Sequence, residues 1–134
     1  MLQKVCVFLL LLVVYPSVLL AAEWMIVGRN GDRSLYIDIN TISTSPQGKS
    51  FFVKTEYGPV SAKEITKQLK SKDAISYDVV DFTIRCDSKT IAQNTVTYYK
   101  KGGMVIGFSD NAYQKFNRII PDSMGEAFMN AVCK

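Results

Sequence analysis

Histidine is absent from this chain of 134 residues, and that absence excludes several kinds of chemistry. Without imidazole there is no ordinary Ser-His or Cys-His nucleophile pair and no imidazole ligand for a metal. No spacing of acidic residues matches a calcium-binding loop. Asp78 and Asp81 lie an odd number of positions apart in one expected strand, so they point to opposite faces and do not pair for glycoside hydrolysis. We therefore expect a protein that is not an enzyme and that has no cofactor or metal.

Long apolar runs are missing everywhere except at the N-terminus, which reads MLQKVCVFLLLLVVYPSVLLAA. One cation at Lys4, an apolar run, Pro16 and then small residues form the layout of a secretory signal. The alternative is a retained membrane anchor, because the run approaches the roughly 18 apolar residues that span a bilayer. The short run and its flanks favour cleavage after Ala22, with a cut after Ala21 as the other choice. We expect residues 1–22 to be a cleaved signal peptide and 23–134 to form a single domain.

Cysteine is also scarce, with three in the chain. Cys6 lies in the expected signal peptide, which leaves Cys86 and Cys133 in the remainder. Two cysteines in an exported protein are expected to pair, whereas a reactive free thiol would need an activating base nearby. No Leu-x-x-Cys pattern precedes the cut, so we expect no lipid attachment and no stable membrane anchor. The expected location is the periplasm or the surrounding medium.

Charge is low, with a formal net value of +4 that falls by one when Lys4 is removed. This balance supports solubility and a weak attraction to acidic surfaces, but it is too small to indicate nucleic-acid binding.

Alternating apolar residues dominate the rest of the chain and predict β-strands. In the segment YDVVDFTIRC, one face carries Val80, Phe82, Ile84 and Cys86, so the cysteine points into the core. Turn residues separate the strands in RNGDR, in SPQGKS and at Gly102–Gly103. The expected strands, about six in number, are 23–28, 34–39, 51–58, 77–86, the segment up to about Tyr99, and a short one around 105–106.

A lysine-rich segment, 61–72, interrupts the alternation. Ser61 and Glu64 fit a capping box, and Ile65 and Leu69 would give a short helix one narrow apolar contact. The alternative is a mobile polar loop, and we favour the helix.

The C-terminal segment has a clearer helical signature. Ser123 can cap a helix with Glu126 reaching back, and a single apolar face is predicted from the spacing of Met124, Ala127, Phe128, Ala131 and Val132. So short a helix is marginal alone in water and must dock on the sheet. A Cys86–Cys133 disulfide would tie its end there. The predicted fold is α+β: a six-stranded antiparallel sheet with a C-terminal helix docked on one face and tied by the disulfide.

Two surface patterns are candidates for binding a partner. One is basic and consists of Lys63, Lys67, Lys70 and Lys72, with Lys54 as a candidate neighbour. The other consists of Tyr99, Lys100 and Lys101, with Tyr99 directed outward or into a homodimer contact and Tyr98 in the core. A solvated surface and ordinary strand packing are the more common explanations of such patterns.

Several stretches resemble the surface-adhesin protein E family of small exported bacterial domains. They are Trp24, YIDINTIS from Tyr36, the cysteine that closes FTIRC, and IIPDSMGEAFMNAVC at the end. The resemblance implies bacterial origin, an antiparallel sheet with a disulfide-tethered C-terminal helix, and adhesion to host extracellular-matrix proteins. The chain departs from the family in having Phe116 where tryptophan is usual, and in lacking an anchoring cysteine.

Three functions are therefore expected, in this order. The first is a non-catalytic exported binding domain that recognises a protein or envelope partner. The second is a surface adhesin for host extracellular-matrix proteins. The third is a periplasmic inhibitor or immunity protein directed against a cell-wall enzyme.

Overall fold

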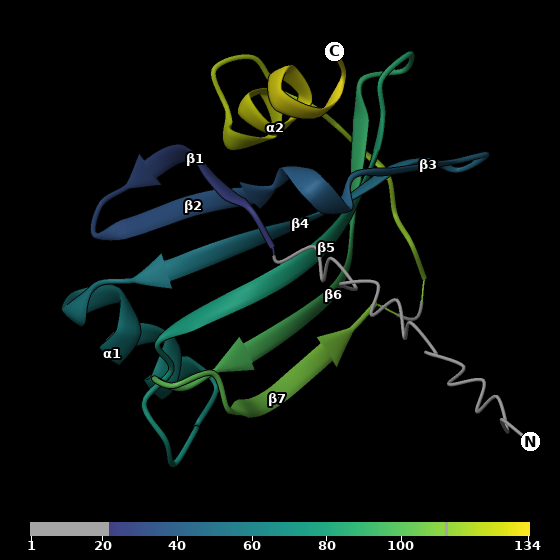
Figure 1. Cartoon of the computed structure of the whole chain (residues 1–134). Coiled ribbons are helices and arrows are strands. Elements are labelled where there is room, and N and C mark those ends of the chain that lie inside the picture. The colour runs from purple at the N-terminus through teal and green to yellow at the C-terminus, as the bar shows by residue number, and fades with distance from the viewer. Residues whose placement is uncertain (1–21, 112) are drawn as a thin grey trace, which may run out of the picture.

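The computed structural model describes residues 22–111 and 113–134, so the expected signal peptide lies outside this part except for Ala22. The described chain forms one twisted sheet with two α-helices (Figure 1). In chain order the elements are β1 (Trp24–Asn30), β2 (Arg33–Asp38), the 3-10 turn η1 (Ile39–Thr41), β3 (Ser43–Ser45), β4 (Gly48–Tyr57), α1 (Pro59–Gln68), β5 (Tyr77–Arg85), β6 (Thr90–Tyr99), β7 (Val105–Asp110), β8 (Asn117–Arg118) and α2 (Met124–Val132).

The strands pair in the order β1-β2-β4-β5-β6-β7, and every pairing is antiparallel. These six strands are the six that the alternating pattern predicts. Two short strands were not predicted: β3 pairs with the start of β4, and β8 pairs with the start of β6. At two and three residues they are too short to show a period.

The first hairpin turns as RNGDR predicts. β1 and β2 pair up to Asn30 and Arg33, which leaves Gly31 and Asp32 as the turn. Gly31 has φ +61°, a conformation that glycine adopts without steric cost.

One face of the sheet carries the main core, and α2 covers it. Phe51, Ile37 and Ile84 on this face are almost fully buried. Phe128 of α2 is 5% exposed, and its ring lies 5.9 Å from that of Phe51 and 5.5 Å from that of Phe82. The helix docking predicted from the apolar spacing is therefore confirmed.

The Cys86–Cys133 disulfide is present and joins the end of β5 to the end of α2, with the two Cα atoms 5.7 Å apart. The sequence separation of 47 residues implies about 4 kcal/mol of stabilisation on the loop-entropy model.

The cap of α2 differs in one detail from the predicted capping box. The Ser123 hydroxyl accepts the Glu126 N–H at 3.3 Å, as expected. The Glu126 carboxylate, however, accepts the N–H of Asp122 at 2.8 Å rather than that of Ser123. Asp122 has φ +60° and lies in the turn that leads into the helix.

The segment 61–72 is helical in its first part, as favoured, but the predicted Ser61–Glu64 capping box is wrong. Gly58 is the N-cap and Pro59 follows it, so Ser61 lies inside the first turn. The cap comes from the distant Asp32, whose carboxylate accepts the N–H of Val60 at 2.9 Å and that of Ser61 at 3.1 Å. A Cβ on Gly58 would lie 2.6 Å from this carboxylate, so only glycine fits.

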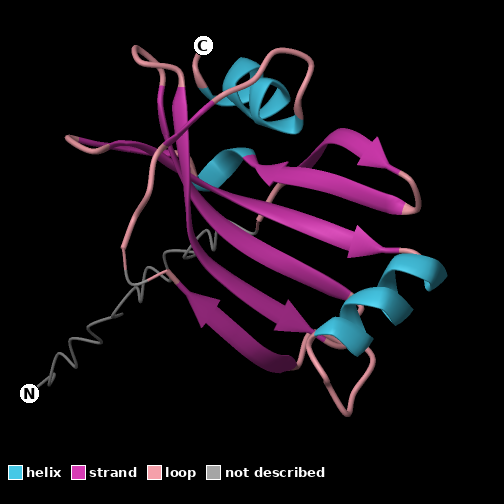
Figure 2. Cartoon of the chain, turned by 180° about the vertical axis from the view of Figure 1, so that it is seen from behind, coloured by secondary structure: helices cyan, strands magenta, loops and turns pink. Residues whose placement is uncertain are grey.

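Both helices lie on the same face, which is turned toward the viewer in Figure 2. α2 lies beside β1, and α1 lies at the far end of the sheet, where β4 finishes.

Phe128→Ala should lower the free energy of unfolding by roughly 3 to 5 kcal/mol, because it empties a buried aromatic site. Phe52→Ala is the matched control, since Phe52 is 40% exposed on the other face of the sheet. Urea unfolding of both variants measures the difference. A loss below about 0.5 kcal/mol for Phe128→Ala, the range of ordinary surface substitutions, would contradict the packing described.

Candidate functional site

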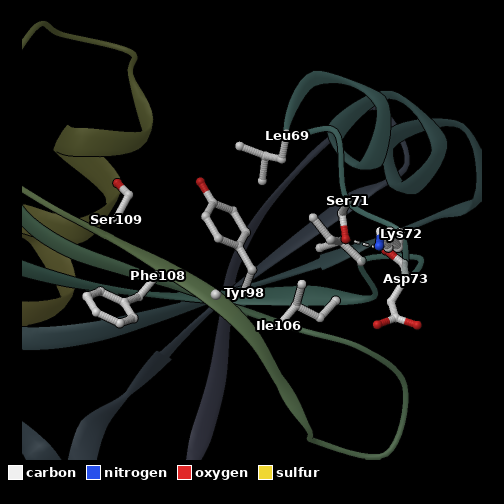
Figure 3. A pocket seen from close by; sticks show the side chains of 10 residues that line it. Leu69, Ser71, Lys72, Asp73, Tyr98, Ile106, Phe108 and Ser109 are labelled. Carbon is white, nitrogen blue, oxygen red and sulfur yellow. Dashed lines mark hydrogen bonds between the residues drawn. The ribbon is translucent and has the colours of Figure 1, made fainter.

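A pocket of about 440 Å³ lies between β6–β7 and the segment that links α1 to β5. Tyr98 and Ile106 extend from the sheet toward Leu69 at the end of α1 (Figure 3). The volume is within the range of small-ligand sites. The lining residues are Leu69, Ser71, Lys72, Asp73, Ile75, Tyr98, Ile106, Gly107, Phe108 and Ser109.

The segment that links α1 to β5 forms one wall of the pocket and is held in place by hydrogen bonds. Ile75 is 1% exposed, and its N–H donates to the Thr66 hydroxyl at 3.0 Å. The next residue, Ser76, donates its N–H to the Tyr99 carbonyl at 2.8 Å and accepts from the Tyr57 N–H at 3.0 Å. The linking segment is therefore fixed to both α1 and the sheet, and the pocket is preformed.

The pocket exposes apolar surface at its rim. Leu69 is 43% exposed and Phe108 is 73% exposed, although both are large apolar residues. Exposed apolar residues that gather around a concavity are typical of binding sites.

The structure brings lysines from both predicted clusters to this end of the sheet. Lys72 lines the pocket, and Lys70 lies between two lining residues. Lys100 begins the β6–β7 turn and reaches across to Asp73 at 3.9 Å, with Lys101 next to it. Lys63 and Lys67 lie on α1, where they line a separate hollow together with Lys70.

Two of the candidate residues lie away from this pocket. Tyr99 points to the face of the sheet opposite Tyr98, because adjacent strand residues point to opposite faces, and its ring stacks on Tyr77 at 4.7 Å. Lys54 is also on that opposite face, with its amine 5.1 Å from the ring centres of Trp24 and Tyr36.

Tyr98, expected in the core, is instead half-buried in the pocket wall. Leu69, Ile106 and Phe108 were not predicted as site residues. The one signal for Ile106 and Phe108 is the unbroken apolar and neutral run from Met104 to Ser109, which would otherwise be left on a short edge strand.

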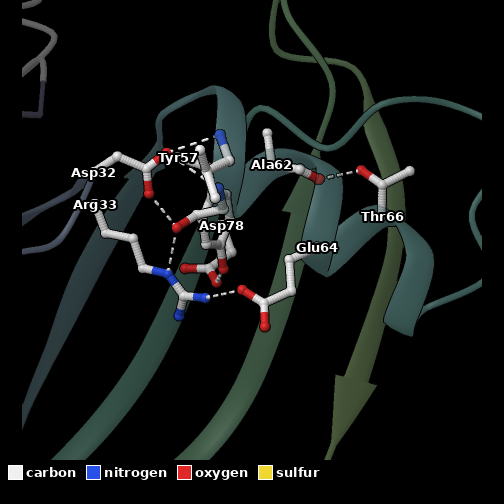
Figure 4. A network of polar contacts seen from close by, with 9 residues as sticks. Asp32, Arg33, Tyr57, Ala62, Glu64, Thr66 and Asp78 are labelled. Atoms are coloured by element: carbon white, nitrogen blue, oxygen red, sulfur yellow. Dashed lines mark hydrogen bonds and ion pairs between the residues drawn. The ribbon is translucent and has the colours of Figure 1, made fainter.

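A polar network beside the pocket fixes α1 to the sheet (Figure 4). The Arg33 Nε donates to the Ser61 hydroxyl at 3.0 Å, and its guanidinium lies 3.7 Å from the Glu64 carboxylate. The same guanidinium stacks over the Tyr57 ring at 5.4 Å. The Ser61 hydroxyl donates in turn to Asp32, and these hydrogen bonds hold the Asp32 pKa below its usual value.

Asp78 is the deepest carboxylate of this network, at 6% exposed. Its Oδ2 accepts the Tyr57 hydroxyl, whereas its Oδ1 has no hydrogen-bond partner among the described residues. Burial raises the pKa of Asp78, against the lowering effects of the Tyr57 and Thr55 hydrogen bonds and the Arg33 charge. Burial also raises the pKa of Tyr98, which pairs with Asp78 across the strands, and the Asp78 charge adds to that shift.

Within residues 22–111 and 113–134, no three His, Cys, Asp or Glu side chains are grouped so that they could hold a metal ion. In the same part of the chain, neither helix has the length and apolarity that a membrane crossing requires.

The fold and this site together define a small disulfide-tied α+β protein with a preformed, partly apolar pocket at one end of its sheet. The family model described as surface-adhesin protein E matches residues 24–134, which is most of the chain. The protein therefore belongs to the surface-adhesin protein E family, and the resemblance seen in the sequence is confirmed. No curated protein and no solved structure gave a match to the chain.

Asp78→Asn should change how stability depends on pH. The pKa of Asp78 is higher in the folded state than in the unfolded state, where it is near 3.8. Such a carboxyl stabilises the folded state at a pH below the unfolded pKa, and this contribution is lost as the pH rises through the folded pKa. The free energy of unfolding of the wild type, relative to Asp78→Asn, should therefore fall as pH rises from about 3 toward 7.

Urea unfolding at several pH values measures this difference. Asp87→Asn is a control, because Asp87 is exposed at the end of β5. A wild type that gains relative stability with rising pH would show that the Arg33 cation outweighs burial.

Proposed function

We propose that this protein is an exported, non-catalytic binding domain of bacterial origin that recognises a protein partner in the cell envelope or outside the cell. Residues 23–134 act as one domain after a signal peptide, 1–22, is removed. The pocket between α1 and β6–β7 is the contact site, and the lysines around it attract an acidic partner.

The observation that carries this proposal is the position of the lysines. Lys72 lines the partly apolar pocket, and Lys70 lies between the lining residues Leu69 and Ser71. From the β6–β7 turn, Lys100 approaches the lining residue Asp73 to 3.9 Å, with Lys101 next to it. Separate chain segments that place like charges around an apolar concavity give both attraction and buried area to a partner.

Membership in the surface-adhesin protein E family favours a binding role over catalysis. It also supports a second candidate, adhesion to host extracellular-matrix proteins. The two differ in location, since adhesion requires the protein at the cell surface or in the medium.

Localisation is the first test. Fractionation, protease shaving of intact cells and N-terminal sequencing should give an exported product that begins near Glu23. A protected periplasmic product would support an envelope partner and exclude adhesion, and surface exposure would support adhesion. A product that retains residues 1–22 in the cytoplasm would contradict both.

Removing charge at the pocket should weaken partner binding. The variant Lys70→Gln, Lys72→Gln, Lys100→Gln, Lys101→Gln should bind a partner captured by the wild type at least about tenfold more weakly at low salt, because opposite charges steer and hold the complex.

The matched control is Lys89→Gln with Lys115→Gln, which removes exposed charge away from the pocket. Biolayer interferometry at two salt concentrations gives the measurement. Equal weakening by both variants would mean that net charge matters and the pocket does not.

A further inference from the structure

β7 is a free edge of the sheet. It pairs with β6 on one side, and in the part of the chain that the structure describes no strand pairs with its other side. Natural proteins commonly protect such edges with lysine, proline or a covering segment. β7 has the sequence VIGFSD, which contains neither lysine nor proline. Val105 and Phe108 on this strand are both more than half exposed.

The register of β7 shows which backbone groups face outward. The Asn111 N–H donates to the Asn94 carbonyl at 3.0 Å, directly across the ladder. Hydrogen-bonded and non-bonded pairs alternate in antiparallel sheets. The pairs Phe108–Thr97 and Asp110–Thr95 are therefore non-bonded, and the N–H and C=O groups of Phe108 and Asp110 point away from β6.

The pocket opens beside this edge. Ile106, Gly107 and Ser109 of β7 contribute to its lining. A Cβ on Gly107 would have no heavy atom within 4 Å, so the β7 side of the pocket is open where a side chain would otherwise stand. A strand added to β7 would lie about 4.8 Å beyond it, with alternate side chains on the pocket side.

The surrounding charge indicates what such a strand would carry. Lys70, Lys72, Lys100 and Lys101 are the cations near the pocket, whereas Asp73 is the one acidic residue in its lining and faces Lys100. A ligand that complements this site has apolar side chains at alternate positions and acidic side chains near them.

We propose that β7 and the pocket bind an extended peptide segment of a partner protein by strand addition. The segment pairs with the outward groups of Phe108 and Asp110, places an apolar side chain past Gly107 into the pocket, and offers acidic residues to the lysines. This inference rests on the proposed function and states how the pocket engages its partner.

The probe is a library of acetylated, amidated peptides of about eight residues, long enough to pair with the regular part of β7 from Gly107 to Asp110 and to extend past the bulge at Ile106. Apolar residues alternate with acidic or polar ones. Peptides of this design should bind the wild type, and N-methylation along the best binder should weaken it at every second residue, because only alternate N–H groups face β7.

Gly107→Val should block the pocket without harming the fold. Gly107 does not have a positive φ, and valine favours strands. We expect an unchanged or higher melting temperature and peptide binding at least about tenfold weaker. Thr97→Val is the matched control, since Thr97 is next to Tyr98 on β6, points to the opposite face from Tyr98 and Gly107, and does not line the pocket; it should bind as the wild type does.

A second pair of variants tests the backbone contact. Phe108→Pro removes an outward N–H that β6 does not use, and proline is tolerated at such edge positions. Phe108→Ala keeps the N–H and removes the side chain. We expect the proline variant to bind at least about tenfold more weakly than the alanine variant, and melting curves confirm that both are folded.

The outcomes separate this inference from the proposed function. Binding that is insensitive to N-methylation and equal in Phe108→Pro and Phe108→Ala would overturn strand addition. If the lysine-to-glutamine variant still weakens that binding, the pocket remains the site. A wild type that binds no library peptide, or that instead forms dimers lost in Gly107→Val, would also overturn it. If the lysine-to-glutamine variant bound as tightly as the wild type while the N-methylation and Phe108 variants gave the expected results, the proposed function would be contradicted and strand addition would be supported.

Discussion

The contact of Phe128 with Phe51 and Phe82 is the interaction on which the rest of the structure depends. A single twisted sheet has two faces and cannot bury either by itself, so one layer must come from elsewhere. α2 supplies that layer with nine residues, too few to be stable alone. The disulfide holds the helix where its aromatic residue can reach the sheet. Because α2 occupies only one end of this face, the other end is left to α1 and the pocket.

The strand order largely follows the order of the chain. The pairs β1-β2, β4-β5, β5-β6 and β6-β7 are strands consecutive along the chain, with α1 inserted between β4 and β5, and β2-β4 is separated only by the short β3. After β7 the chain instead returns to pair β8 with β6, and this return brings Ile119 into the core beneath α2. That return leaves the outer side of β7 without a partner strand.

Much of this fold could be predicted from residue patterns, since strand faces, the first hairpin and α2 depend on local periodicity and turn residues. Phe128 and Cys86 were predicted in their roles because each follows from such a pattern. The start of α1 was not, because its cap, Asp32, lies 28 residues earlier. The pocket was missed for a similar reason: Leu69 and Phe108 come to line one pocket only after the sheet has formed. Tyr98 was assigned to the core because the alternating pattern shows which face of the sheet a residue is on. The pattern does not show which part of that face is covered by a helix.

The long-range cap on α1 also affects the order of folding. Helices usually form early, because their hydrogen bonds are local. In this chain, two of the first N–H groups of α1 are satisfied by the turn of the β1–β2 hairpin. The helix is therefore completed only when that hairpin has docked beside β4. Because α1 has local hydrogen bonds but a cap from a distant part of the chain, its formation depends on assembly of the sheet. The helix should therefore become ordered at the same time as the β1–β2 hairpin and not before it.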